Sequence, residues 1–202
     1  MTGTEAQEFT ERLLVVESED IESVDLVAYS FDVKKITDAI SALGPKVRAL
    51  MGHSMCVGGR TKLQLQAAQQ LNSNGCSVRV GRGRGIRAAY LARDRDVGVG
   101  DTLKGIIHGK SMLVRYDPSR VTRGAVCVIR RTNWTDSSTA NLEFSAVLRE
   151  VGEDFERDWT AEFTRGWTSS KALVDAVQEE DSKGGLDRRS ASRSASQSRG
   201  RG

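Results

Sequence analysis

Two ionisable side chains stand on an otherwise apolar stretch, residues 106–114. His108, one of only two histidines in the chain, is followed two residues later by Lys110. Strand residues two apart point to the same face, so we expect the two side chains to lie side by side. A lysine is costly at a strand centre unless its charge meets an anion or an acid. An adjacent ammonium also lowers the pKa of an imidazole, which keeps it neutral and nucleophilic. The pair suits attack on an anionic phosphorus centre; solvated side chains on an edge strand are the alternative.

A second polar segment, residues 132–143, directly follows the apolar run 125–129 and reads TNWTDSSTANLE. Asn133 at the end of a strand can present an amide donor to a phosphoryl oxygen. An ordinary turn rich in Asn, Ser and Thr is the alternative.

Taken together, the two segments resemble the phospholipase D superfamily, whose signature is HxKxxxxD followed after a short strand by GSxN. The run His108-Gly109-Lys110 matches the first two signature positions, and residues 132–143 look like the STNW…SSxxANxE segment of the family. The resemblance covers about residues 22 to 170. It is strongest to the single-motif members, the bacterial-type endonucleases and the mitochondrial cardiolipin hydrolase-like proteins.

The resemblance implies a role for each matching residue. His108 would be the nucleophile that forms a phosphohistidine, and Lys110 and Asn133 would hold the non-bridging phosphate oxygens. Glu143 looks like the carboxylate that orients the imidazole. Family enzymes use two such half-sites without a metal or other cofactor, so one motif per chain implies a homodimer. The implied reaction is hydrolysis of a phosphodiester in phospholipid or nucleic acid.

The chain departs from the family pattern at three arginines. Arg115 stands where the signature has Asp, and Arg130 and Arg131 stand where it has Gly and Ser. The arginine pair can clamp a phosphate bidentately or fill the pocket with bulk and charge. The sequence therefore leaves open a catalytically degenerate relative that binds nucleic acid or anionic lipid.

Hydrophobic periodicity predicts the elements that position these residues. The predicted fold is α/β, a mixed β-sheet flanked by helices, which the resemblance implies is one phospholipase D-type domain. We expect Asp32 to cap the first long helix. A stripe of Phe and Trp from Phe155 to Trp167 is expected to face the core. The expected strands cover residues 24–29, 46–51, 78–80, 106–114, 125–129 and 141–148, and the expected helices residues 32–43, 61–72 and 154–176.

Length and composition set the wider limits. The 202 residues, 38% hydrophobic and 28% charged, suit one globular domain, here residues 22–180, with a lead-in over 1–21 that is either a short helix or frayed. Residues 181–202, mostly Ser, Arg and Gly, predict a disordered tail. The net charge of the chain is +3, and residues 182–202 alone carry +5. Residues 1–181 therefore have a net charge of −2.

The sequence contains no recognisable membrane span, targeting peptide or metal-binding pattern. No apolar run is long enough to span a membrane, and the acidic first residues do not resemble a targeting peptide, so the expected location is cytoplasmic or unspecified. Three scattered cysteines and two histidines predict neither a disulfide framework nor a metal site.

Overall fold

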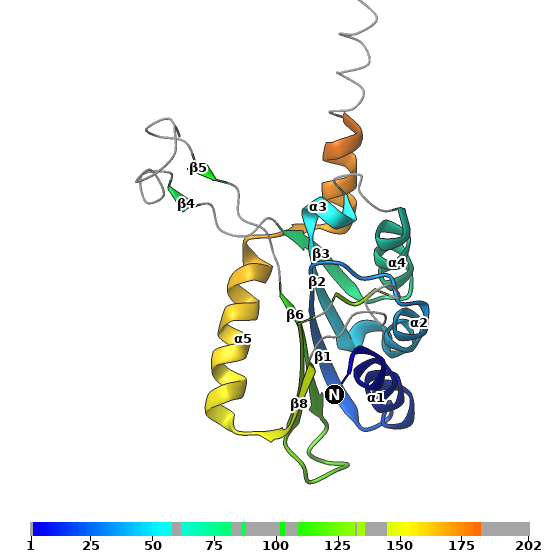
Figure 1. The fold of residues 1–202 in the computed structure, drawn as a ribbon, viewed down its shortest axis with the longest axis vertical. Helices are drawn as coiled ribbons and strands as arrows, with labels where there is room; N and C mark the ends of the chain where they lie inside the picture. Colours follow the sequence, from blue (N-terminus) through cyan, green and yellow to red (C-terminus); the bar gives the residue numbers. More distant parts are fainter. Residues whose placement is uncertain are drawn as a thin grey trace, which may run out of the picture.

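Helices and strands alternate in the first half of the chain, and strands follow one another in the second (Figure 1). This computed structural model describes residues 2–57, 62–81, 86–87, 102–103, 109–131, 133–135 and 145–182. A further helical segment runs over residues 173–182. The helices are α1 (Gly3–Val16), α2 (Lys34–Leu43), the short α3 (His53–Cys56), α4 (Lys62–Ser73) and α5 (Glu153–Thr168), with a 3-10 turn over Gly44–Lys46.

The strands form a mixed seven-stranded sheet with the order β8-β7-β6-β1-β2-β3-β9. Strands β1, β2 and β3 are parallel, and β6, β7, β8 and β9 each pair antiparallel with a neighbour. A separate pair joins β4 (Ile86–Arg87) to β5 (Thr102–Leu103). The sheet strands are β1 (Ile21–Ala28), β2 (Val47–Gly52), β3 (Ser77–Gly81), β6 (Lys110–Tyr116), β7 (Ala125–Arg130), β8 (Ser145–Val151) and β9 (Lys171–Ala172).

Helices cover both faces of the sheet, as the sequence predicted. Helices α1, α2 and α4 lie on one face and α5 lies on the other (Figure 1). The main core sits under α1, α2 and α4, where Leu14, Ile40 and Leu71 meet the strand residues Leu26 and Met112. Alternate residues of β1 and β6 therefore serve the two faces. No helix within the described ranges is long and apolar enough to cross a membrane.

The beginning of the chain is a helix rather than a frayed lead-in. Thr2 caps α1 in a reciprocal capping box with Glu5, which satisfies two backbone donors at the helix start. Leu13 and Leu14 of α1 are buried in the main core. Residues before β1 thus contribute to the same core as the strands.

Two local predictions were wrong. Residues 154–176 are not one helix: α5 ends at Thr168, and β9 follows before the helical segment 173–182 begins. The short polar side chain of Ser170 donates to the Trp167 carbonyl, a local bond that competes with helix continuation. Asp32 does not cap α2, because Val33 is the N-cap residue and the Asp32 N–H donates to the Trp134 carbonyl.

Of the aromatic stripe on α5, Phe163 is buried as predicted, and the other three residues are half-buried. Phe155 and Trp159 pack against a small cluster centred on Leu113 and Cys127 on the α5 face of the sheet. Cys127 is a fully buried free thiol, consistent with a small core residue.

Candidate active site

The residues that could take part in chemistry gather where several strands end, and this row of strand ends is called the edge of the sheet here. Strands β1, β2, β3 and β7 end at this edge, and the antiparallel β6 begins there with Lys110. The chain adds β2 and β3 on one side of β1, then crosses β1 to form β6 on its other side. Ligands of open α/β sheets bind outside the carboxyl ends of the strands where the order reverses, so Lys110 stands at the favoured position.

Two buried cations lie on adjacent strands at this edge. Lys110 and Arg130 are only 8% and 4% exposed. The pair Ser111–Ile129 ends the β6–β7 ladder, and the two cations are the next residues along these strands. Fully buried Lys and Arg are rare because removing a charge from water is costly. Their proximity concentrates positive potential where a strand-edge ligand would lie.

Both cations contact aromatic rings. The Lys110 ammonium lies 5.7 Å from the centroid of the Tyr29 ring, and the Arg130 guanidinium carbon lies 4.7 Å from that of Trp134. Such contacts help to hold a buried cation in place. Arg130 is therefore buried against Trp134 at this edge, whereas Arg131 is exposed.

A chain of hydrogen bonds fixes the backbone next to Lys110. The Tyr29 N–H donates to the Gly109 carbonyl at 3.0 Å, and the side chain of buried Gln64 bridges the Tyr29 carbonyl and the Phe31 N–H at 3.1 and 3.0 Å. Glycine is required at 109, because a Cβ there would lie 2.5 Å from the Val27 Cγ1. Gln64 thus positions the segment that follows β1.

The segment carrying Asn133 joins the same scaffold. The Trp134 N–H donates to the Ser30 carbonyl at 3.0 Å, and Trp134 pairs with Phe31 in a parallel bridge. Asn133 is half-buried, and its Oδ1 is buried with no hydrogen-bond partner among the residues that the structure describes. This orphaned atom is an acceptor, so it can meet a donor group but not a phosphate oxygen. The structure brings Asn133, Lys110 and Arg130 to one sheet edge.

Two of the predicted site residues cannot be placed. His108 and Glu143 lie outside the described residues, as do Thr132 and residues 183–202 of the expected tail. The distance from imidazole to carboxylate stays a prediction. Residues 181 and 182, the first of that tail, belong to the helical segment 173–182.

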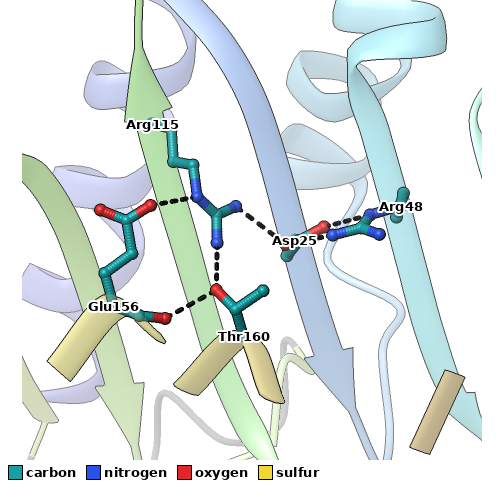
Figure 2. Close-up of polar contacts among 5 residues, drawn as sticks. All are labelled: Asp25, Arg48, Arg115, Glu156 and Thr160. Carbon is teal, nitrogen blue, oxygen red and sulfur yellow. Dashed lines mark hydrogen bonds and ion pairs between the residues drawn. The ribbon is translucent and has the colours of Figure 1, made fainter. Parts of the chain in front are cut away.

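Arg115 takes no part in this edge. It lies five residues beyond Lys110 and points to the α5 face, where Figure 2 shows it between β1 and α5. Its guanidinium donates to Asp25 at 2.9 Å, to Glu156 at 2.5 Å and to the Thr160 hydroxyl at 2.6 Å. Arg48 of β2 binds the same Asp25 through two bonds of 2.6 and 2.7 Å. The arginine at the signature's Asp position is therefore a structural residue.

A hollow of about 980 Å³ adjoins this ionic network. It is lined by Arg48, Arg115 and Arg157 together with Glu22, Glu153 and Glu156. Because its arginines are matched by these acids and by Asp25, it offers no net attraction to a phosphate. Size alone does not make it the candidate site.

Tyr29 and Gln64 are site residues that the sequence reasoning missed, whereas Trp134 belongs to the segment at residues 132–143 that carried the resemblance. Tyr29 was placed at a strand end and Gln64 on a predicted helix. The predicted helix over residues 61–72 contains four glutamines, so the sequence did not single out the one that is buried.

Comparisons with known proteins agree with this geometry. The structure resembles the phospholipase D family member Nuc from Salmonella typhimurium, with a TM-score of 0.57 and 15% identity over 82% of this chain and 89% of that one. It also resembles NucT from Helicobacter pylori, with a TM-score of 0.58 and 16% identity over 84% and 94%. The chain has the phospholipase D fold.

The same fold forms part of a larger protein. Polyphosphate kinase from Porphyromonas gingivalis matches with a TM-score of 0.52 and 13% identity over 81% of this chain but only 24% of the kinase. No protein-family model matches the sequence, and no curated protein matches it. At these identities the likeness establishes the phospholipase D fold and leaves the chemistry to the residues themselves.

The described part of the chain contains no group of three or more His, Cys, Asp or Glu residues that could hold a metal ion. The charge at the candidate edge comes instead from Lys110 and Arg130.

Proposed function

We propose that this protein is a phosphodiesterase that cleaves its substrate at the edge of the sheet marked by Lys110. The observation that carries the proposal is the pair of buried cations, Lys110 and Arg130, at the end of the strands where the order reverses. A phosphodiester is an anion, which positive charge at this position attracts. The phospholipase D fold and the motif at residues 108–110 support the same reaction.

In the proposed reaction, a nitrogen of His108 attacks phosphorus and forms a phosphohistidine while the leaving oxygen departs and takes up a proton. Water then attacks the phosphohistidine and releases the phosphomonoester. Lys110 and the Asn133 amide hold the non-bridging oxygens and stabilise the charge that builds up on them. Glu143 orients the imidazole through its second nitrogen.

A second copy of the chain completes this proposed site. Protonation of the leaving oxygen requires an acid, and we assign it to the histidine of a second motif. Since each chain carries one motif, the active species is a two-fold homodimer with the reaction at its interface. Sedimentation equilibrium at assay concentration tests this point, and a strict monomer that retains full activity would exclude it.

The decisive experiment is hydrolysis of bis(p-nitrophenyl) phosphate without added metal and in the presence of EDTA. We expect the wild-type protein to release p-nitrophenolate and His108→Ala to fall to background. A matched variant, His53→Ala, removes the chain's other histidine and should retain activity. Equal rates for wild type and His108→Ala would refute the proposal.

Binding without cleavage is the second candidate function. It is favoured by Arg130, whose buried guanidinium packs on Trp134 where the family pattern has glycine. Under this alternative the protein binds nucleic acid or anionic liposomes with an affinity that falls steeply with salt. Measuring that affinity with and without residues 183–202 separates a contribution of the tail from one of the sheet edge.

A further inference from the structure

Gln64 is a polar residue on the buried face of helix α4. It is 0% exposed, and the buried residues that follow it at helical spacing, Ala67, Ala68 and Leu71, belong to the main core. A buried amide is costly unless it is hydrogen-bonded, and a leucine of similar size would pack there without that requirement. The reason for a polar residue at this position must therefore lie in its hydrogen bonds.

Both ends of the Gln64 amide bind one backbone segment, residues 29–33, which follows β1. The Nε2 group donates to the Tyr29 carbonyl at 3.1 Å, and Oε1 accepts from the Phe31 N–H at 3.0 Å. Since β1 ends at Ala28, these backbone groups lie beyond the parallel pairing of β1 with β2. Buried backbone polar groups need partners, and Gln64 supplies two of them in this segment.

This segment is bonded to the motif that carries Lys110. The Tyr29 N–H donates to the Gly109 carbonyl at 3.0 Å, and Gly109 directly precedes Lys110. The ring of Tyr29 also lies 5.7 Å from the Lys110 ammonium. Through Tyr29, Gln64 therefore holds both the backbone before Lys110 and the ring beside its ammonium.

The same segment is bonded to the residues around Asn133. The Ser30 carbonyl accepts from the Trp134 N–H at 3.0 Å, and the Asp32 N–H donates to the Trp134 carbonyl at 2.8 Å. Phe31, whose N–H binds the α4 glutamine, lies between these two positions and forms the parallel bridge with Trp134. Asn133 directly precedes Trp134, so one short segment connects both parts of the proposed phosphate site.

Helix α4 lies on the face of the sheet to which Lys110 points. Met112 belongs to the main core under α1, α2 and α4, and strand residues two apart share a face, so Lys110 points to that face as well (Figure 1). Phe31 and Trp134 are members of the same core. Gln64 thus reaches the segment from the side on which the Lys110 charge lies.

We propose that Gln64 is a positioning residue of the candidate active site. Its two hydrogen bonds fix residues 29–33 and, through them, the relative positions of Lys110 and Asn133. The inference rests on the proposed function in taking Lys110 and Asn133 as the phosphate ligands. A misplacement of about 1 Å can lower a rate about a hundredfold, so loss of the amide should be visible in kcat.

Gln64→Leu removes both hydrogen bonds at similar side-chain size. With bis(p-nitrophenyl) phosphate we expect kcat to fall about tenfold or more and KM to change by less than about threefold, because the lost alignment matters most in the transition state. Asp25→Asn, which breaks the ionic network on the α5 face, is the control for lost stability and should retain the wild-type kcat. Every variant is assayed where circular dichroism shows it to be folded.

Gln64→Glu gives a second readout, the pH profile of kcat. A protonated carboxyl group offers one donor and one acceptor and can make both bonds, whereas the ionised group can only accept and would repel the Tyr29 carbonyl. Burial raises the pKa of the introduced carboxyl group above its usual value of about 4.3. The ratio of variant to wild-type kcat should therefore approach one at about pH 5 and fall as the pH rises to about 8.

Gln66→Glu is the matched control for this pH profile. It places the same carboxyl group at an exposed residue of α4, two positions further along, and should give a ratio that does not change with pH. Taking the ratio to wild type cancels the titration of groups that the proteins share, such as His53 and Asp32. The p-nitrophenol released at each pH is read after alkaline quenching.

The outcomes separate this inference from the proposed function. Wild-type kcat and a flat pH ratio for both Gln64 variants would overturn the inference and leave the phosphodiesterase intact, as would an equal fall in kcat for Asp25→Asn. If the wild-type protein hydrolyses nothing, the proposed function fails, and isothermal titration with inorganic phosphate decides the inference. Binding about tenfold weaker in Gln64→Leu than in wild type would then support it, and equal or absent binding would overturn it.

Discussion

Replacing Asp25 by Asn is expected to destabilise the protein more than any exposed charge change. The Asp25 carboxylate is 1% exposed and accepts two bonds from Arg48 and one from Arg115. Breaking a buried ion pair from one side costs about 3–5 kcal/mol, because the remaining charge stays buried without compensation. Arg115 also bonds Glu156 and Thr160 (Figure 2), which the change leaves in place, and Arg48 is already 41% exposed. We therefore expect the low end, about 3 kcal/mol.

Urea unfolding followed by circular dichroism measures this loss. In a domain of this size, a loss of about 3 kcal/mol corresponds to a fall in Tm of roughly 6–12 °C. The control is Arg157→Ala, which removes an exposed ion pair to Asp154 and should cost less than about 1 kcal/mol. Arg115→Asp, which restores the signature's residue, should destabilise more than Asp25→Asn, because it places two carboxylates in one buried site. A loss below about 1 kcal/mol for Asp25→Asn would show that solvent screens the network and would refute the reasoning.

Three further predictions concern the scaffold. Gly109→Ala forces a Cβ against Val27 and should cost about 1–3 kcal/mol in unfolding free energy and lower phosphodiester hydrolysis, whereas an unchanged Tm would contradict the clash. Gln64→Leu, similar in size, should cost about 1–3 kcal/mol by leaving two backbone groups unpaired; no change in urea midpoint would mean that water replaces the amide. Burial raises the pKa of the three thiols in the folded state, so the thiols of the unfolded chain lose their protons at a lower pH than those of the folded protein. Stability should fall as the pH rises above about 9, and Cys→Ala variants unfolded at pH 8 and pH 10 should show a smaller fall. The thiols concerned are Cys56, with a pKa raised to about 12, and Cys76 and Cys127, each raised to about 11.

Periodicity predicted the sheet well, because each strand carries its own pattern of buried residues. The predicted run 125–129 corresponds to β7, and 78–80 lies within β3. Element ends were less accurate: 154–176 was divided by β9, whose two residues hold too little pattern to be seen. Pairing with Arg79 and Val80 defines that strand, and this is a long-range contact absent from local sequence.

Candidate site residues could be predicted from the sequence where they belong to a motif. They could not be predicted where tertiary packing determines the position of the side chain. Lys110 and Asn133 were identified by type and position, and the structure places both at one edge. The sequence left open whether Arg130 clamps a phosphate or fills the pocket. The answer depends on where its guanidinium packs, and in the structure it packs on Trp134. Likewise, nothing local indicated that Arg115 would meet Asp25, ninety residues earlier in the chain.

The two-residue strand β9 also bears on how the protein avoids assembling with itself. An open sheet edge is a template on which another chain can add strands. Here β9 covers the end of β3 and is itself too short to extend the sheet, and it carries Lys171, paired with Glu179. A chain that stopped before this strand would expose Arg79 and Val80 of β3 as an unpaired edge. The segment after α5 therefore protects the outer strand β3 from pairing with another chain.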